Sequence, residues 1–169
     1  MLENEVEIKF RGLRRNRKWA YGYVVKNSKG DSFIVNDNGN RYKVDANTIG
    51  QLVLRTPTDL NKFGRSGNYE DFLDVYVGDI LEARCDFPYV DGYQGYSVKI
   101  GDKFVVTNIE SGYTLVPLDM YSHWSKSRCF SQCRLMTNWF LWNNHRFLKP
   151  IGNIYDDSWR VGQNKIYFM

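Results

Sequence analysis

The sequence predicts an all-β protein built mainly of short antiparallel strands, arranged as a pseudo-barrel or a sandwich with one or two short capping helices. Aromatic residues make up 16% of the 169 residues, and aromatic side chains fit the pleated surface of a sheet. Short segments of alternating polarity recur along the chain, separated by turns rich in Gly, Asn and Asp. About ten such strands with closely spaced turns are typical of a barrel or a sandwich.

The first third of the chain is a series of predicted hairpins. We expect strands over residues 7–11, 19–25, 32–35 and 41–44, joined by turns at 12–18, 27–31 and 36–40. Asn38-Gly39 in the last of these turns suits a primed hairpin turn. Asp45 is expected to cap one helical turn that ends at Thr48, and a further strand is expected over 49–54.

The second half of the chain is organised around a strand that begins at Gly78-Asp79. Gly accepts a positive φ and Asp bonds its own backbone, so the pair predicts a tight turn, after which Ile80-Leu81 enters a core. Strands are also expected over 113–116 and 147–155, and Pro150 places the latter at a sheet edge. We further predict a hairpin of 96–100 with 103–107 across Gly101-Asp102 and surface loops over 56–69 and 86–95. Residues 132–142 are expected to form a helix, with a strand pair as the alternative.

Cysteine usage and hydropathy restrict the expected cellular setting. Three cysteines, an odd number, favour free thiols. Residues 1–5 contain no apolar signal core, and no run reaches the length of a membrane span. We therefore expect a single soluble domain over residues 1–169, in a reducing compartment and without a membrane partner.

The net charge of +4 is unevenly distributed along the chain. Residues 1–29 carry eight Lys/Arg and three Glu, and residues 120–149 carry five basic residues and no acidic one. Residues 30–119 are acidic, with fourteen Asp/Glu against eight Lys/Arg. The two basic regions either form a basic face or neutralise the acidic middle within one fold.

A basic loop followed by an aromatic strand is the candidate nucleic-acid site. Basic groups track phosphates, aromatic faces stack on bases, and small β-barrels often carry such sites. Trp19, Tyr21 and Tyr23 are alternate residues of the expected strand and therefore share one face, a pattern that a strand packed into a core would also show. The candidate contacts are Arg14, Arg15, Arg17, Lys18 and Trp19.

The aromatic and basic segment 121–147 is the candidate interface for a protein partner or for a second copy of the chain. Tyr, Trp and Arg are enriched at interface hot spots, and an edge strand over 147–155 could extend a partner's sheet. Packing within the same chain would account for the same pattern. The candidate interface residues are Tyr121, Trp124, Trp139 and Trp142.

No metal site, cofactor site or catalytic site is predicted. Cys129 and Cys133 have a spacing that zinc accepts, but they are a single pair, and His123 lies on the wrong side for a zinc finger. Asn143-Asn144-His145 is similar to part of a metal-nuclease signature, yet residues 120–155 contain no Asp or Glu. Cys85 has no His near it in the sequence, so a reactive thiol lacks its base. We therefore expect no enzymatic activity.

Four motifs together resemble the YopX family of small phage and prophage proteins. They are Ile8-Lys9-Phe10-Arg11-Gly12, Thr48-Ile49-Gly50-Gln51, Val75–Leu81 and Ile151–Asp156, and they follow the family's order over nearly the whole chain. The family-motif positions, which we take as structural, are Gly50, Gln51, Gly78, Asp79, Gly152 and Asn153.

The chain departs from the family pattern at three places. Thr56-Pro57-Thr58-Asp59 and a longer polar loop replace the turns that usually follow the Gly-Gln motif. Val77 stands where an acidic residue usually precedes Gly-Asp, and the segment at about 118–146 is a divergent insertion.

The resemblance implies an all-β pseudo-barrel with helical caps, a phage or prophage origin and a bacterial cytoplasm. It supplies no catalytic residue. The sequence thus leads to a non-enzymatic accessory module that binds an unknown phage or host protein, or a second copy of itself. The alternative is a nucleic-acid-binding β-barrel that uses loop 14–18 and the nearby aromatic residues.

Overall fold

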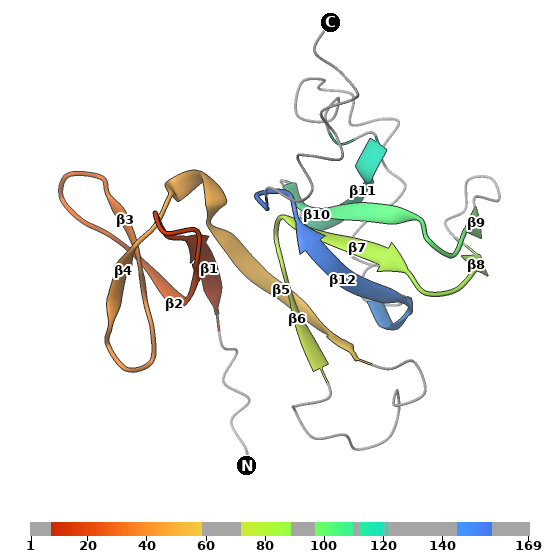
Figure 1. Cartoon of the computed structure of the whole chain (residues 1–169), viewed down its shortest axis with the longest axis horizontal. Coiled ribbons are helices and arrows are strands. Elements are labelled where there is room, and N and C mark those ends of the chain that lie inside the picture. The colour runs from red at the N-terminus through yellow and green to blue at the C-terminus, as the bar shows by residue number, and fades with distance from the viewer. Residues whose placement is uncertain are drawn as a thin grey trace, which may run out of the picture. The chain divides into compact units, whose positions relative to one another are not determined.

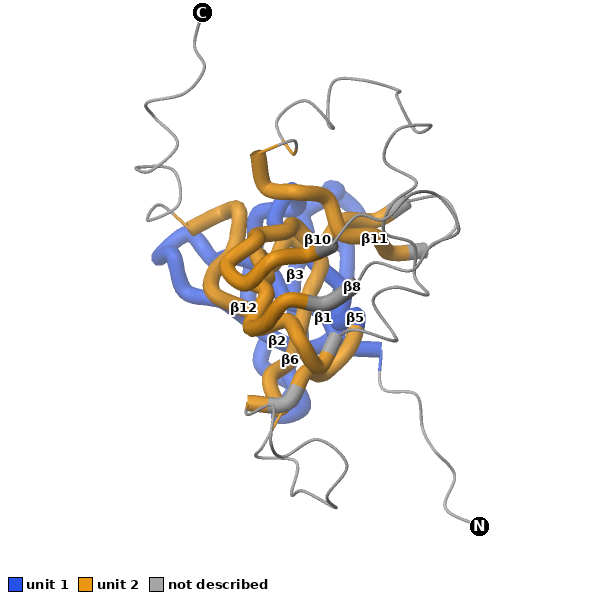
Figure 2. Tube along the Cα trace, turned by 90° about the vertical axis from the view of Figure 1, so that its right-hand side faces the viewer, with its two compact units in different colours: residues 1–53 blue, residues 54–169 orange. Residues whose placement is uncertain are grey.

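A computed structural model describes residues 8–58, 72–88, 97–109, 112–119, 121 and 145–156 (Figure 1). These residues are mostly in strands, and the strands form open antiparallel sheets. The all-β prediction is therefore confirmed, and the sheets do not close into a barrel. The chain divides into two compact units, residues 1–53 (unit 1) and 54–169 (unit 2), coloured blue and orange in Figure 2. That both belong to one domain stays a prediction.

Unit 1 is an antiparallel sheet in the strand order β4-β3-β2-β1-β5. Its strands are β1 (Phe10–Leu13), β2 (Trp19–Lys26), β3 (Ser32–Val35), β4 (Arg41–Lys43) and the first residues of β5 (Gly50–Pro57). The predicted hairpins are confirmed by the pairing of β1 with β2, β2 with β3 and β3 with β4. β1 runs later in the chain than predicted, because Gly12 and Leu13 pair with Ala20 and Trp19.

A single helical turn joins β4 to β5, as the sequence predicts. The 3-10 turn η1 (Ala46–Thr48) is capped by Asp45, whose Oδ1 accepts a hydrogen bond of 2.9 Å from the Asn47 backbone N–H. The Thr48 hydroxyl oxygen accepts a hydrogen bond of 2.9 Å from the Leu13 N–H. The turn is thereby tied to the end of β1, and β5 then runs back beside β1.

Strand β2 changes its pairing partner at Gly22. Residues 19–22 pair with β1, and residues 23–26 pair with β3. Gly22 has a φ of +143°, and a β-carbon there would overlap the carbonyl oxygen of Val35. Only a residue without a side chain fits this close approach of two backbones.

The core of unit 1 lies on one side of this sheet. It is built from three buried residues on three strands or their ends, Ala20, Ile34 and Val44, with Phe10, Val24, Tyr42 and Ile49 packed against them. β2 contributes alternate residues to this core, so the residues between them point to the opposite side. That opposite side carries the candidate site.

Unit 2 contains a four-stranded sheet in the order β11-β10-β7-β12. The strands are β7 (Asp79–Ala83), β10 (Lys103–Ile109), β11 (Gly112–Pro117) and β12 (Leu148–Asn153). Unit 2 also holds β6 (Phe72–Tyr76), β8 (Phe87–Pro88), β9 (Ser97–Val98) and the 3-10 turn η4 (His145–Phe147). The edge position predicted from Pro150 is confirmed, since β12 ends the sheet and its register shifts between Pro150 and Gly152.

The Gly78-Asp79 turn is confirmed, and it joins two of the family-motif segments. Asp79 is 4% exposed; its Oδ2 accepts from the Tyr76 N–H at 2.7 Å and its Oδ1 accepts from Asn153 Nδ2 at 3.2 Å. Asn153 pairs with Asp79 across β12 and β7, and Gly152 pairs with Ile80. Ile80 and Leu81 are 1% exposed, so the predicted entry into a core is also confirmed. Gly50 and Gln51, which belong to unit 1, pair with Arg11 and Phe10 across β5 and β1.

The predicted hairpin of 96–100 with 103–107 is wrong. The turn exists, since Gly101 has a φ of +88° and the Asp102 N–H donates to the Lys99 carbonyl at 3.0 Å. However, β9 pairs with β8, whereas β10 pairs with β7 and β11. Phe104, Val105 and Val106 are 0–1% exposed, and the burial gained by placing β10 between β7 and β11 outweighs pairing across the local turn.

Both predicted loops contain strand residues. Thr56 belongs to β5, is 1% exposed and donates its hydroxyl hydrogen to the Leu148 carbonyl at 2.9 Å, while Phe87–Pro88 forms β8. The rest of the first loop from residue 59, most of the second loop and the predicted helix 132–142 lie outside the described residues. So does most of the divergent segment 118–146.

Candidate nucleic-acid interface

The basic loop between β1 and β2 has a defined and strained backbone. The Arg14 N–H donates to the Lys18 carbonyl and the Arg17 N–H to the Arg14 carbonyl, both at 2.9 Å, and the Lys18 N–H donates to Asn16 Oδ1 at 3.2 Å. Arg17 has a φ of +63°, a left-handed conformation that costs a non-glycine residue about 1–2 kcal/mol. Strained residues of this kind cluster at functional segments. Position 17 carries an arginine although glycine would adopt this conformation at a lower energetic cost.

The five predicted nucleic-acid contacts divide into two groups. Arg15, Arg17 and Lys18 are exposed, and neither Arg15 nor Lys18 forms an ion pair within the part of the chain that the structure describes. Arg14 and Trp19 are partly buried and belong to cation–π pairs. The Arg14 guanidinium lies 4.5 Å from the ring centroid of Tyr42, and the Arg11 guanidinium lies 4.5 Å from that of Trp19.

The tyrosines of β2 point away from the core of unit 1. Tyr21 is 45% exposed and Tyr23 is 50% exposed, whereas Ala20 is 4% exposed and Val24 packs on the core. The interpretation of these rings as core residues is therefore wrong. Alternation along a strand fixes which residues share a face, but it does not say which face is buried.

Neighbouring strands add cations and rings to the same side of the sheet. Tyr21 lies opposite Arg11, and Tyr23 lies opposite Val35, whose other neighbour is Arg41. The Arg41 guanidinium lies 3.9 Å from the ring centroid of Phe33. The sequence analysis did not include Arg11 and Arg41 in the candidate site, because only the pairing register of the strands places them on this face. We call this face of the sheet the aromatic–basic face, formed by Trp19, Tyr21, Tyr23, Phe33 and Arg41; Arg11 lies on the same face but is only 7% exposed.

Unit 1 carries a large excess of positive charge. Residues 8–53 contain ten Lys/Arg and three Asp, a formal charge of +7, which the three Glu of residues 1–7 reduce to +4. Two of the three aspartates have structural partners. Asp45 caps η1, and Asp31 pairs with Lys43 at 2.7 Å, a contact that together with Asn27 holds the pKa of the Asp31 carboxyl below its usual range.

A groove of about 360 Å³ opens beside Tyr21, and we call it the Tyr21 groove. It lies between the β1–β2 hairpin and the β3–β4 turn, and its volume falls within the range of small-molecule sites. The groove is lined by Lys9, Arg14, Trp19, Ala20, Tyr21, Asn36, Asp37 and Tyr42. Rings, cations and one amide–carboxylate pair therefore surround a single opening.

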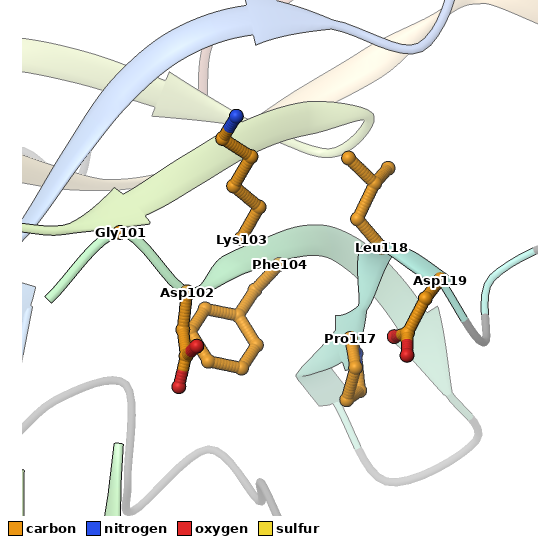
Figure 3. A pocket seen from close by; sticks show the side chains of 7 residues that line it. All are labelled: Gly101, Asp102, Lys103, Phe104, Pro117, Leu118 and Asp119. Carbon is orange, nitrogen blue, oxygen red and sulfur yellow. The ribbon is translucent and has the colours of Figure 1, made fainter. Parts of the chain in front are cut away.

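A second depression, in unit 2, has the opposite electrostatic character. It has a volume of about 430 Å³ and lies where β10 begins and β11 ends. Figure 3 shows Asp102, Phe104 and Asp119 on one side of the ribbon, with Lys103 and Leu118 pointing to the other. The Phe104 ring is 1% exposed and two carboxylates flank it, so this depression does not suit a phosphate chain.

The structure describes only a few of the predicted interface residues and potential metal ligands. Tyr121 is partly buried, and burial, with Tyr155 nearby, raises the pKa of its phenol. Trp124, Trp139 and Trp142 lie outside the described residues, as do His123, Cys129 and Cys133. Among the described residues, Cys85 is a free thiol, and no group of three potential metal ligands occurs.

Comparison of the chain with family models, curated proteins and solved structures finds no match in any of the three. The resemblance to the YopX family therefore stays a prediction. In the segments that the structure covers, no helix is both long enough and apolar enough to cross a membrane. The geometry of unit 1 is consequently the main basis for a functional proposal.

Proposed function

We propose that this protein binds single-stranded nucleic acid through the aromatic–basic face of unit 1. One observation carries the proposal: Tyr21 and Tyr23 are 45% and 50% exposed on the side of β2 that faces away from the core. Exposed rings beside cations hold a strand by stacking on its bases and attracting its phosphates.

The spacing of the two tyrosines favours a single strand over a duplex. Alternate residues of a strand lie about 6.6 Å apart, roughly twice the 3.4 Å rise of a duplex strand. Bases that stack on Tyr21 and Tyr23 must therefore be separated from each other. A duplex keeps its bases stacked and paired, so its bases do not reach such rings.

The basic loop supplies the phosphate contacts in this proposal. Arg15, Arg17 and Lys18 are exposed and follow one another immediately before β2, so a strand lying along β2 passes the loop at one end. Each cation that neutralises a phosphate releases counterions, so the affinity falls with salt by about 0.7 logarithmic units per contact per tenfold rise.

Fluorescence anisotropy tests the proposal directly. A labelled oligothymidine, the matching RNA and a duplex of equal length are titrated with the protein at about 50 mM and about 200 mM salt. We expect both single strands to bind more tightly than the duplex, and binding to weaken steeply at the higher salt. Equal affinity for the duplex and the single strands would contradict the proposal that Tyr21 and Tyr23 stack on unpaired bases.

Variants separate stacking from charge. Tyr21→Ala and Tyr23→Ala should each weaken binding by about 1–3 kcal/mol, or about 5–150-fold. The double variant Arg15→Ala/Lys18→Ala should lower the salt slope by about 1.4. Ile100→Ala removes an apolar side chain that is 68% exposed in unit 2, and Lys149→Ala removes an exposed cation there; both serve as matched controls and should bind like the parent protein.

The remaining expectations are part of the proposal. The protein acts without enzymatic activity in a bacterial cytoplasm and derives from a phage or prophage, as the YopX resemblance implies. Association with a phage or host protein, or with a second copy, through the segment around Tyr121 is the second candidate function. Tyr121 itself is partly buried, and a concentration-dependent mass in solution would support self-association.

A further inference from the structure

We infer that the Tyr21 groove reads the Watson–Crick edge of a guanine in the bound strand. The inference rests on the proposed function and names the base that this site prefers. Asn36 and Asp37 both line the groove, opposite the rings and cations of the β1–β2 hairpin. Binding by base stacking and phosphate contacts alone requires neither Asn36 nor Asp37.

The position of Asn36 is fixed by the β3–β4 turn. The Asn36 N–H donates to the Asn40 carbonyl at 3.0 Å, and Asn36 Oδ1 accepts from the Asn40 N–H at 2.8 Å. Because Oδ1 is engaged, the amide orientation is set, and Nδ2 is the group that donates to a ligand. The turn thus presents a side-chain donor at the groove.

Asp37 is the acid of unit 1 that has no structural role among the described residues. Asp31 pairs with Lys43 and Asp45 caps η1, whereas Asp37 is exposed and makes no hydrogen bond within the described ranges. A carboxylate beside a phosphate chain repels it. Its place in a basic groove is explained if it accepts hydrogen bonds from a base.

Guanine matches this pair of side chains. A carboxylate accepts two hydrogen bonds side by side, and guanine is the base whose Watson–Crick edge offers two adjacent donors, N1–H and the N2 amino group. Guanine O6, next to them, accepts from a donor such as Asn36 Nδ2. Recognition of splayed bases by these edges, with stacking on a ring, is typical of single-strand readers. Three aromatic residues line the groove, Trp19, Tyr21 and Tyr42, and a ring from this set supplies the stacking surface.

The test compares oligothymidines that differ at one central base, guanine, hypoxanthine or adenine. Hypoxanthine lacks only the N2 amino group. We expect guanine to bind about tenfold more tightly than the other two, and Asp37→Asn to abolish the difference. Asp119→Asn changes the charge of the chain by the same amount at an exposed site in unit 2, and it should leave the guanine preference intact.

The outcomes separate this inference from the proposed function. Tight but equal binding of all three oligonucleotides overturns the guanine site and leaves the aromatic–basic face standing. Tighter binding of every sequence by Asp37→Asn, with no base preference in the parent protein, also overturns it, because Asp37 then acts by repulsion alone. No binding of any oligonucleotide at low salt overturns both proposals.

Discussion

Replacing Gly22 by alanine should destabilise unit 1 more than replacing any exposed turn glycine. A β-carbon at Gly22 would overlap the Val35 carbonyl oxygen and lie 2.7 Å from its carbon. These are backbone atoms, so no side-chain rotation relieves the clash. The positive φ of +143° adds a conformational penalty for any side chain.

The magnitude follows from two contributions. A residue held in a conformation that only glycine favours costs about 1–3 kcal/mol, and overpacking typically costs about 1–3 kcal/mol more. Gly22→Ala should therefore lose about 2–6 kcal/mol. Gly30→Ala is the matched control, because Gly30 also has a positive φ, +83°, but a β-carbon added there would meet no atom within 4 Å; it should lose about 1–2 kcal/mol.

Urea denaturation and thermal unfolding of the two variants, side by side, provide the measurement. A difference of 1 kcal/mol shifts the midpoint of a domain of this size by about 2–4 °C. Gly22→Ala should also weaken oligonucleotide binding, because Tyr21 and Tyr23 flank the glycine. If the two variants lose equal stability, β3 does not approach β2 at Val35 and the reasoning fails.

Three further predictions concern the loop, the buried carboxylate and acid stability. Arg17→Gly should be about 1–2 kcal/mol more stable than Arg17→Ala in urea denaturation, since both lose the side chain but only glycine relieves the positive φ; equal stability would contradict the strained loop. Asp79→Ala should lose about 2–4 kcal/mol and Asp79→Asn about 1–2 kcal/mol, because each buried donor left without its acceptor costs about 1–3 kcal/mol, and a reversed order would be inconsistent with the two hydrogen bonds of Asp79. The Asp86 carboxylate accepts hydrogen bonds from the Ile100 N–H and from Lys99 Nζ, and these contacts lower the pKa of its carboxyl. The stabilisation that Asp86 gives the folded state is therefore present at neutral pH and is lost as the pH falls through the lowered pKa. In thermal melts over a pH series, Asp86→Asn should lose less stability between neutral and acid pH than the parent protein does.

Caps and turns were predicted correctly from the sequence where residues close together along the chain determine them. The Asp45 cap, the turn at 36–40 and the turn at Gly78-Asp79 all depend on residues within four positions of one another. Turn chemistry of this kind acts through a side chain and its own backbone. These predictions needed no knowledge of the rest of the fold.

Pairing between distant strands could not be predicted in the same way. Gly101-Asp102 makes a turn, yet β9 and β10 join different neighbours. Thr56 looks like a loop residue because a proline and polar residues follow it, but its hydroxyl bonds to Leu148, 92 positions away. Burial of whole strands decides such cases, and it depends on residues that are remote in the sequence.

The candidate site shows the same division. By itself, the sequence determined the basic loop, the alternation of Tyr21 and Tyr23 on one face of a strand, and the all-β class, because these depend on composition and a two-residue period. Only the tertiary structure decided that Tyr21 and Tyr23 are exposed, that Arg41 lies on the same face, and that Asn36 and Asp37 share a groove with Tyr21. The physical reason is that a strand has two equivalent faces until a core of other strands covers one of them.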